Sequence, residues 1–352
     1  MSYTDGWAAM NLEMPARIPR SEFDAQTHWE LVKRVTGIDV NFKSPPEVRD
    51  RAAQAFTRAW NYDILLSANI FWEIFDGFCT NMGHAEYMDG GVDFNDDIRC
   101  PFKTPEEVLA FDPWKQFGVH DKEAIKKRFE DHYRTVTEQY PTMVNTAGTY
   151  VTHVSGAISL FGWDLLLEAA GLDPDGFGEV MNRYSSWFLQ YYEALAETSA
   201  PVVYSHDDIV WTAGAFIHPD WYRRYVFPNL KKLYAPLIDA GKKIIFLSDG
   251  NYTQFVDDIA ACGVHGFFFE PLTDLSYVAE KYGKTHVIIG NADTRILLMG
   301  TKADIRAEVE RCMSIGRHCP GYFMGVTNMI PHNTPVENAL YYNEVYEELS
   351  RR

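Results

Sequence analysis

The chain has 352 residues, of which 46% are hydrophobic, so it can fold as a globular protein with a large core. Its formal net charge is −17, from 32 basic and 49 acidic side chains. This charge argues against nucleic acid or a membrane surface as a partner, because both attract basic proteins. An acidic surface is also usual in plain cytosolic enzymes.

Five cysteines are scattered along the chain without a CxxC pair, which is typical of free thiols in a reducing compartment. The first twenty residues lack the basic and apolar pattern of a secretory signal. No run of about 18 apolar residues occurs, so we expect no transmembrane helix. These features together predict a cytoplasmic protein.

The N-terminal third is predicted to be mostly helical. Residues 16–24 are expected to form a first strand or an extended lead-in segment, and residues 87–99 are rich in Gly and Asp and predict a loop or an irregular hairpin. The predicted helices are residues 27–36, 47–60, 101–111 and 121–139.

From about residue 150 the chain alternates between short apolar runs and longer helical patterns. The predicted strands are residues 150–154, 201–205, 244–247, 266–269, 285–290 and 321–326. The predicted helices are residues 165–170, 174–198, 218–240, 254–262, 301–315 and 334–348. This alternation is the mark of βαβ units and a parallel sheet. No GxGxxG turn follows a strand, so a barrel is favoured over a dinucleotide-binding fold.

We therefore predict an α/β protein with a (β/α)8 TIM barrel, whose functional site lies at the carboxyl ends of the strands. We expect one domain over residues 1–352, in which residues 1–145 include helical N-terminal additions.

Polar residues follow nearly every predicted strand. These residues are His153, His206, Asp207, Asp208, Asp249, Glu270, Asn291 and Asn328. A polar residue after a strand is also an ordinary cap for the next helix, so each one alone has a structural alternative. As a set they predict a polar barrel mouth.

His206, Asp207 and Asp208 form the densest cluster, and the alternation of side chains along a strand predicts that His206 and Asp208 share one side. A histidine beside carboxylates is a plausible general acid, and neighbouring carboxylates such as Asp249 and Glu270 tend to split their pKa values. A solvated loop with one capping Asp is the structural alternative.

A metal site is a separate hypothesis. If zinc is bound, the expected ligands are His206, Asp208, Asp249 and Glu270. Aromatic residues make up 14% of the chain. Most of them belong in the core, but Tyr204 and Trp211 flank the His-Asp-Asp cluster and would suit a pocket for a flat ligand.

Five stretches of the chain resemble the uroporphyrinogen decarboxylase superfamily, in its methyltransferase branch. They are ARIPRSEFDAQTHWELV near the start, PFKTPEEVLAFDP at 101–113, and the segments 205–251, 287–313 and 333–340. The resemblance implies a (β/α)8 barrel with its site at the carboxyl-terminal mouth.

The resemblance also implies what this chain lacks. True uroporphyrinogen decarboxylases open with an arginine-bearing segment that holds the substrate carboxylates, whereas Arg17 and Arg20 stand here in a different setting. Thiol-activating zinc methyltransferases of the family carry HxC where this chain has Leu247-Ser248-Asp249. Decarboxylation therefore stays only as a third alternative, and soft-metal thiol activation is not expected.

What remains implies a corrinoid-dependent methyltransferase, an O-demethylase component that moves a methyl group from a methoxylated, aromatic compound to a cobalt(I) corrinoid protein. His206, Asp207, Asp208, Asp249 and Glu270 are the predicted catalytic residues, and His153, Tyr204, Trp211, Asn291 and Asn328 the predicted substrate-binding residues. The alternative is a methylcorrinoid:tetrahydrofolate methyltransferase, in which Asp249, Asn291 and Asn328 bind the pterin.

The implied partners are a corrinoid-binding protein and a small methyl donor or acceptor, with a homodimer as a further option. A barrel that only binds a ligand is the non-enzymatic alternative.

Overall fold

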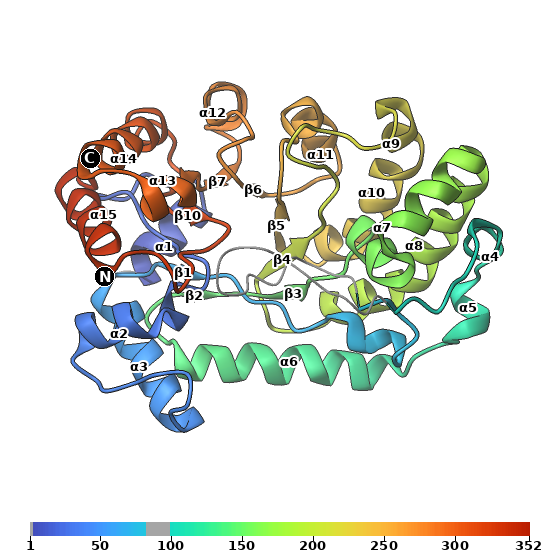
Figure 1. The fold of residues 1–352 in the computed structure, drawn as a ribbon, viewed down its shortest axis with the longest axis horizontal. Coiled ribbons are helices and arrows are strands. Elements are labelled where there is room, and N and C mark those ends of the chain that lie inside the picture. Colours follow the sequence, from blue (N-terminus) through green and yellow to red (C-terminus); the bar gives the residue numbers. More distant parts are fainter. Residues whose placement is uncertain (1–2, 82–98) are drawn as a thin grey trace.

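The computed structural model describes residues 3–81 and 99–352, and it is an α/β fold in which helices surround a parallel sheet (Figure 1). The predicted loop at 87–99 lies outside the described residues, apart from Arg99. The largest sheet has six parallel strands in the order β3-β4-β5-β6-β7-β9. These strands are β3 Ala147–Thr149, β4 Val202–His206, β5 Lys243–Ser248, β6 Gly266–Phe269, β7 Val287–Ile289 and β9 Tyr322–Phe323.

Two further segments close this sheet into a barrel. The segment of β1 (Ile64–Leu65) pairs with β2 (Val144–Asn145), and Ile70 bridges to Thr149 in parallel. On the other side, Arg20 bridges to Met324, and the Asp63 N–H donates to the Arg20 carbonyl at 3.0 Å. The six strands and these two segments form the eight parallel positions of the barrel wall in the described chain, as a (β/α)8 barrel requires. Each of these eight positions is called a stave. The predicted first strand or lead-in segment thus bridges to its neighbours at Arg17 and Arg20, and it ends before Asp24, which is left-handed with a φ of 55°.

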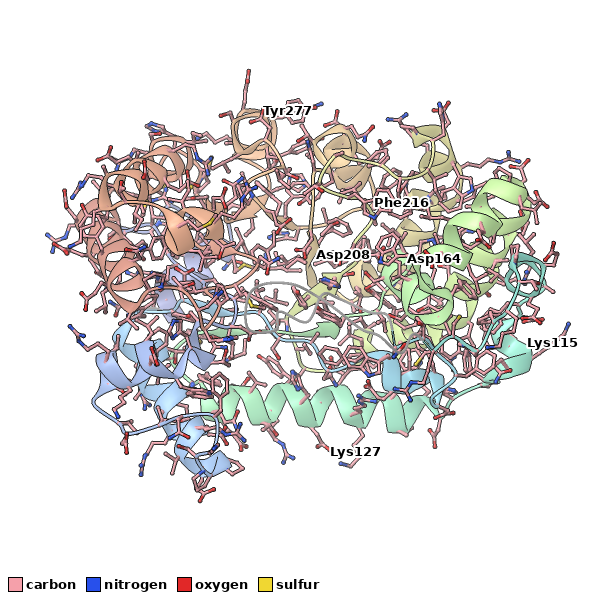
Figure 2. The ribbon with its side chains drawn as sticks, viewed as in Figure 1. Lys115, Lys127, Asp164, Asp208, Phe216 and Tyr277 are labelled. Atoms are coloured by element: carbon pink, nitrogen blue, oxygen red, sulfur yellow. The ribbon has the colours of Figure 1, made fainter. Side chains whose placement is uncertain are left out.

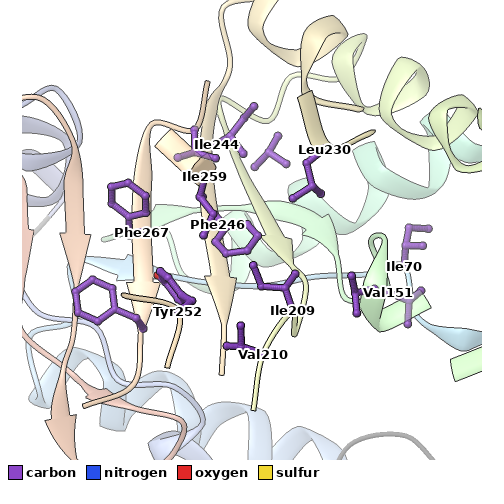
Figure 3. Close-up of a cluster of buried hydrophobic side chains, with 14 of the residues drawn as sticks. Ile70, Val151, Ile209, Val210, Leu230, Ile244, Phe246, Tyr252, Ile259 and Phe267 are labelled. Atoms are coloured by element: carbon purple, nitrogen blue, oxygen red, sulfur yellow. The ribbon is translucent and has the colours of Figure 1, made fainter. Parts of the chain in front are cut away.

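Side chains alternate between the lumen and the helix layer along each stave, because successive residues of a strand point to opposite faces. One core cluster fills the lumen and includes Val202, Tyr204, Ile245, Leu247 and Phe268. The intervening residues pack outward against the helices. Figure 3 shows this outer layer, with Ile244 and Phe246 of β5 and Phe267 of β6 beside Ile259 and Leu230.

The helices lie outside the barrel. The longer ones are α2 Trp29–Thr36, α3 Pro46–Ala59, α6 Lys122–Gln139, α7 Val154–Leu172, α8 Pro174–Ala196, α10 Phe227–Asp239, α12 Leu275–Tyr282, α14 Lys302–Gly316 and α15 Val336–Leu349. The shorter ones are α4 Pro105–Leu109, α5 Pro113–Gln116, α9 Pro219–Tyr225, α11 Val256–Ala261 and α13 Thr294–Met299, with 3-10 turns at Ala25–Thr27, Trp72–Phe75 and Thr253–Phe255. Two short strands, β8 Ala292–Asp293 and β10 Val326–Thr327, pair beyond β7 and β9.

One further helix, α1 (Tyr3–Met10), was not predicted, and it covers the amino-terminal end of the barrel. Ala9 and Met10 belong to the lumen core, and the Met10 carbonyl lies 2.9 Å from the ring nitrogen of His265, just before β6. The opposite end, where the carboxyl ends of the strands meet, is left for the site. No helix within the described residues is long and apolar enough to cross a membrane.

Three predicted elements are wrong in their bounds. The strand predicted at 150–154 lies earlier, at β3, and the short helix predicted at 165–170 is the end of α7, which kinks at Gly162. The helix predicted at 218–240 is two helices that meet at Val226. Pro228 explains this break, since it has no N–H to donate to the Arg224 carbonyl and its ring clashes with that carbonyl.

Candidate functional site

The alternation along β4 separates the three residues of the His-Asp-Asp cluster. His206 follows Val202 and Tyr204 on the lumen face, and its Nε2 lies 3.4 Å from Oδ1 of Asp208. Asp207 points the other way, into the helix layer. The predicted pairing of His206 with Asp208 is therefore present, and only these two members of the cluster face the lumen.

A stacked pair of rings forms one wall of the site. The ring of Tyr150 lies parallel to that of His206, with centroids 4.1 Å apart and an interplanar angle of 2°. Nδ1 of His206 is 2.7 Å from the Tyr150 carbonyl, and a carbonyl only accepts, so Nδ1 carries a proton. A second proton on Nε2 would complete an ion pair with Asp208. Tyr150 was not predicted as a site residue, because it was taken as the start of a strand.

Asp249 and Glu270 follow two neighbouring strands, β5 and β6, whose last paired residues are Ser248 and Phe269. The Asp249 N–H donates to Oδ1 of Asp208 at 2.9 Å, which joins the two strand ends. Figure 2 shows Asp208 near the middle of the projected molecule. The carboxylates of three consecutive strands thus lie together at the barrel mouth.

Glu270 is held in place by two donors. The Gly250 N–H donates to one carboxylate oxygen at 2.7 Å, and Nδ2 of Asn328 donates to the other at 3.1 Å. Asn328 has a φ of 79°, a left-handed conformation that asparagine adopts more readily than most residues. The amide of Asn328 therefore fixes a carboxylate of the site.

Asp249 has the most perturbed carboxyl group of the mouth. Burial raises its pKa well above the usual value, and Asp208 and Glu270 raise it further through charge repulsion. Among the described residues, no group donates a hydrogen bond to the Asp249 carboxyl. The Asp249 carboxyl consequently keeps its proton to a higher pH than an ordinary aspartate does.

Two more groups extend the site into the lumen. The hydroxyl of Tyr204 is fully buried and has no hydrogen-bond partner, and its electrostatic neighbours include Tyr150, Asp249 and Asp208. Asp24 follows the first stave, and burial raises the pKa of its carboxyl. Asp24 was missed because residues 16–24 were predicted only as a first strand or an extended lead-in segment, and their last residue was not counted among the polar strand ends.

His153 and Asp207 do not face the mouth, contrary to the prediction. Oδ1 of Asp207 accepts hydrogen bonds from the N–H groups of His153 and Ser155, at 3.0 and 2.8 Å, and so caps the start of α7. Nε2 of His153 lies 3.2 Å from the Tyr225 carbonyl in the helix layer. Burial lowers the pKa of His153 to about 4 and raises that of Asp207 to about 7.

Asn291 is also committed elsewhere. Its Nδ2 donates to the Thr273 carbonyl at 3.1 Å, and its Oδ1 accepts from Arg311 of α14 at 3.1 Å. Both ends of the amide are thus occupied by the protein. The prediction that every strand-end polar residue converges on one mouth therefore does not hold for Asn291.

Trp211 lies at the rim and is 44% exposed. Its ring packs against those of Trp163 and Phe216, with centroid distances of 5.5 and 5.4 Å. Gly250 allows the loop after β5 to approach the backbone of Trp211 closely, since a Cβ at position 250 would come within 2.6 Å of the Trp211 carbonyl oxygen. The rim beside the carboxylates is therefore partly aromatic.

The two arginines near the start of the chain do not reach the lumen. Arg20 is fully buried, pairs with Glu22 at 2.9 Å, and has its guanidinium 4.2 Å from the ring centre of Tyr346 on α15. Arg17 pairs with Asp63 at 2.5 Å. Both guanidinium groups join the first stave to its neighbours.

The predicted zinc ligands are not arranged as a metal site. Within residues 3–81 and 99–352, no three His, Cys, Asp or Glu side chains are grouped so that they could hold a metal ion. Zinc therefore stays a prediction from the polar strand ends of the sequence.

Comparison with known proteins decides the family. The profile of the uroporphyrinogen decarboxylase family matches residues 76–349. The chain belongs to the uroporphyrinogen decarboxylase family. It is 27% identical over 177 residues to the uroporphyrinogen decarboxylase of Carboxydothermus hydrogenoformans, which is 50% of this chain and 49% of that protein. It is 29% identical over 171 residues to that of Thermus thermophilus, 49% of this chain and 48% of the relative.

The chain thus aligns with about half the length of the curated relatives it matches. Among solved structures, a methyltransferase from Methanosarcina mazei is similar over 98% of both chains, with a TM-score of 0.65 and 18% sequence identity. This likeness supports the shared fold. Membership of this enzyme family and a (β/α)8 barrel, both predicted from the sequence, are confirmed.

Proposed function

We propose that this member of the family is a methyltransferase that takes a methyl group from a methoxylated, aromatic compound and passes it to the cobalt(I) corrinoid of a partner protein. The observation that carries the proposal is the mouth itself: Asp249 is poised to hold a proton between Asp208 and Glu270. Cleavage of a methyl ether requires such an acid at the departing oxygen.

The residues can be assigned roles in this reaction. As the bond between the methyl carbon and the ether oxygen breaks, its electron pair stays on oxygen, and Asp249 delivers its proton there. Glu270, fixed by Gly250 and Asn328, and Asp208 keep that proton on Asp249 until it is needed. The stacked rings of Tyr150 and His206 offer a flat wall for an aromatic substrate.

The corrinoid of the partner protein supplies the nucleophile that accepts the methyl group. The half-exposed aromatic rim of Trp211, Trp163 and Phe216 would be the apolar surface that meets this large, flat group. The rim is open to a partner at this point, since Trp211 is 44% exposed.

Two alternatives are less well supported. Decarboxylation of a porphyrinogen needs arginines for the substrate carboxylates, yet Arg17 and Arg20 are held outside the lumen by Asp63 and Glu22. A tetrahydrofolate methyltransferase would use the amide of Asn291, whose two ends are already bonded within the protein.

The test is to incubate the protein with methoxyarenes and a reduced corrinoid protein and to measure the demethylated phenol by chromatography. We expect turnover by the wild type, falling as the pH rises through the raised pKa of Asp249. Asp249→Asn should lower the rate by at least about 100-fold, the usual contribution of a general acid.

Asp239→Asn, which removes an exposed carboxylate on α10, is the matched control and should keep the wild-type rate. Methyl transfer from a methylated corrinoid protein to tetrahydrofolate, without any reaction of methoxyarenes, would instead establish the second function.

A further inference from the structure

The mouth of the barrel gathers three acidic side chains. Asp208, Asp249 and Glu270 come from three consecutive strand ends. Asp208 accepts from the Asp249 N–H and lies 3.4 Å from the His206 ring, and Glu270 accepts from the Gly250 N–H and the Asn328 amide. The hydroxyl of Tyr150 feels Asp208, Asp249 and Asp24, and these carboxylates raise its pKa further after burial. Arg295 acts electrostatically on Glu270, but no Lys or Arg in the described part of the chain acts on Asp249 or on Tyr150.

The arginines on neighbouring elements are already paired. Arg295 at the start of α13 forms a bidentate ion pair with Asp293, with Nη2 2.7 Å from a carboxylate oxygen. Arg311 of α14 binds Glu308 at 2.7 Å and the amide of Asn291. An anionic ligand at this mouth would therefore have to compete with Asp293 and Glu308 for these two guanidinium groups.

The lumen also leaves hydrogen-bonding capacity unused. The Tyr204 hydroxyl is fully buried without a partner, and the Asp249 carboxyl receives no donor among the described residues. A buried polar group without a partner costs about 1–3 kcal/mol, which a ligand that supplies the missing bond would recover. A ligand hydroxyl or ammonium can donate to the Tyr204 oxygen or to the Asp249 carboxyl, whereas a ligand carboxylate can only accept a hydrogen bond, from the Tyr204 hydroxyl or from a protonated Asp249.

We propose that the site selects methoxy compounds whose other substituents are neutral or cationic hydrogen-bond donors and rejects those that carry a carboxylate. This inference rests on the proposed function, and it names the charge class of the substrate. Repulsion between a ligand carboxylate and the carboxylates of the mouth is the discriminating interaction, and it is only weakly screened at a buried site.

Three ligands that share one methoxyphenol ring test the proposal: vanillyl alcohol, vanillylamine and vanillate, which are neutral, cationic and anionic. Their dissociation constants for the full chain are measured by isothermal titration calorimetry, without the corrinoid partner. We expect vanillate to bind at least roughly tenfold more weakly than vanillyl alcohol, and vanillylamine to bind at least as tightly as the alcohol.

Glu270→Gln should lower the ratio of the vanillate to the vanillyl alcohol dissociation constant by several-fold, because the variant removes one negative charge and keeps the side-chain shape. The exposed change Asp239→Asn alters the net charge equally and should leave this ratio unchanged. Equal or tighter binding of vanillate would overturn the charge rule and leave the proposed function standing. Binding of none of the three ligands would overturn the methoxyarene function, and this inference with it.

Discussion

At the scale of single residues, the fold keeps some titratable side chains neutral by burying them away from water. His153 is one of these side chains. It caps nothing with its side chain, lies fully buried against Tyr184 and Tyr225, and has its pKa lowered to about 4 by burial. Unfolded histidine titrates near pH ~6.5. Between these values the unfolded chain binds a proton that the folded chain does not.

The contribution of His153 to stability is therefore present above pH ~6.5 and is lost as the pH falls toward the folded pKa of about 4. His153→Gln keeps a donor for the Tyr225 carbonyl but does not titrate. Urea unfolding at several pH values should show the wild type losing about 2–4 kcal/mol relative to the variant across this window.

His218→Gln, at an exposed position, provides the control and should follow the wild-type curve. Parallel curves for wild type and His153→Gln would show that His153 is not held neutral by the fold.

At the scale of elements, the close pairing of β3 with β4 depends on Gly148. A Cβ at this position would lie 1.8 Å from the carbonyl oxygen of Tyr204 on β4, a distance that requires the strands to separate. We expect Gly148→Ala to lower the free energy of unfolding by about 3 kcal/mol or more, as measured by urea unfolding. It should also disturb Tyr150, which follows the same strand.

Gly171→Ala is the matched change. Gly171 lies near the end of α7 with no atom within 4 Å of an added Cβ. Alanine there should be neutral or should stabilise the protein by up to about 1 kcal/mol. A similar loss in both variants would mean that glycine matters here through the unfolded chain and not through the strand contact.

At the scale of the whole molecule, closure of the barrel depends on the ion pair of Arg20 and Glu22. Both side chains are fully buried, and Oε2 of Glu22 also accepts the Val326 N–H at 2.7 Å, which ties the first stave to the last. Arg20→Ala leaves the Glu22 carboxylate buried without its cation. Removing one partner of such a pair costs about 3–5 kcal/mol, so the melting temperature should fall by several degrees.

Arg34→Ala breaks the pair of Arg34 with Glu337, in which both side chains are more than half exposed. That variant should change the free energy of unfolding by less than about 1 kcal/mol. If the two arginine variants are equally stable, the barrel does not depend on the buried pair for closure.

Much of the site could be predicted from the sequence, because the position of a strand-end residue depends on the local pattern of apolar and polar residues. A buried strand followed by a polar residue places that residue at the mouth of a parallel barrel, which located Asp249, Glu270 and Asn328. The period of two along a strand predicted that His206 and Asp208 face the same side, and they do. Residues 150–154 were misread, because their β propensity is overridden when Asp207, from another strand, caps α7 at Val154.

The sequence by itself determined the alternation of strands and helices, the barrel class and the polar strand ends, since each depends on residues close together in the chain. Only the tertiary structure decided that residues 17–21 close the barrel and that Asn291 turns to α14. It also decided that Asp249 stands between Asp208 and Glu270. The proton affinity of a carboxyl depends on burial and on charges brought from other strands, and no local pattern encodes these long-range neighbours.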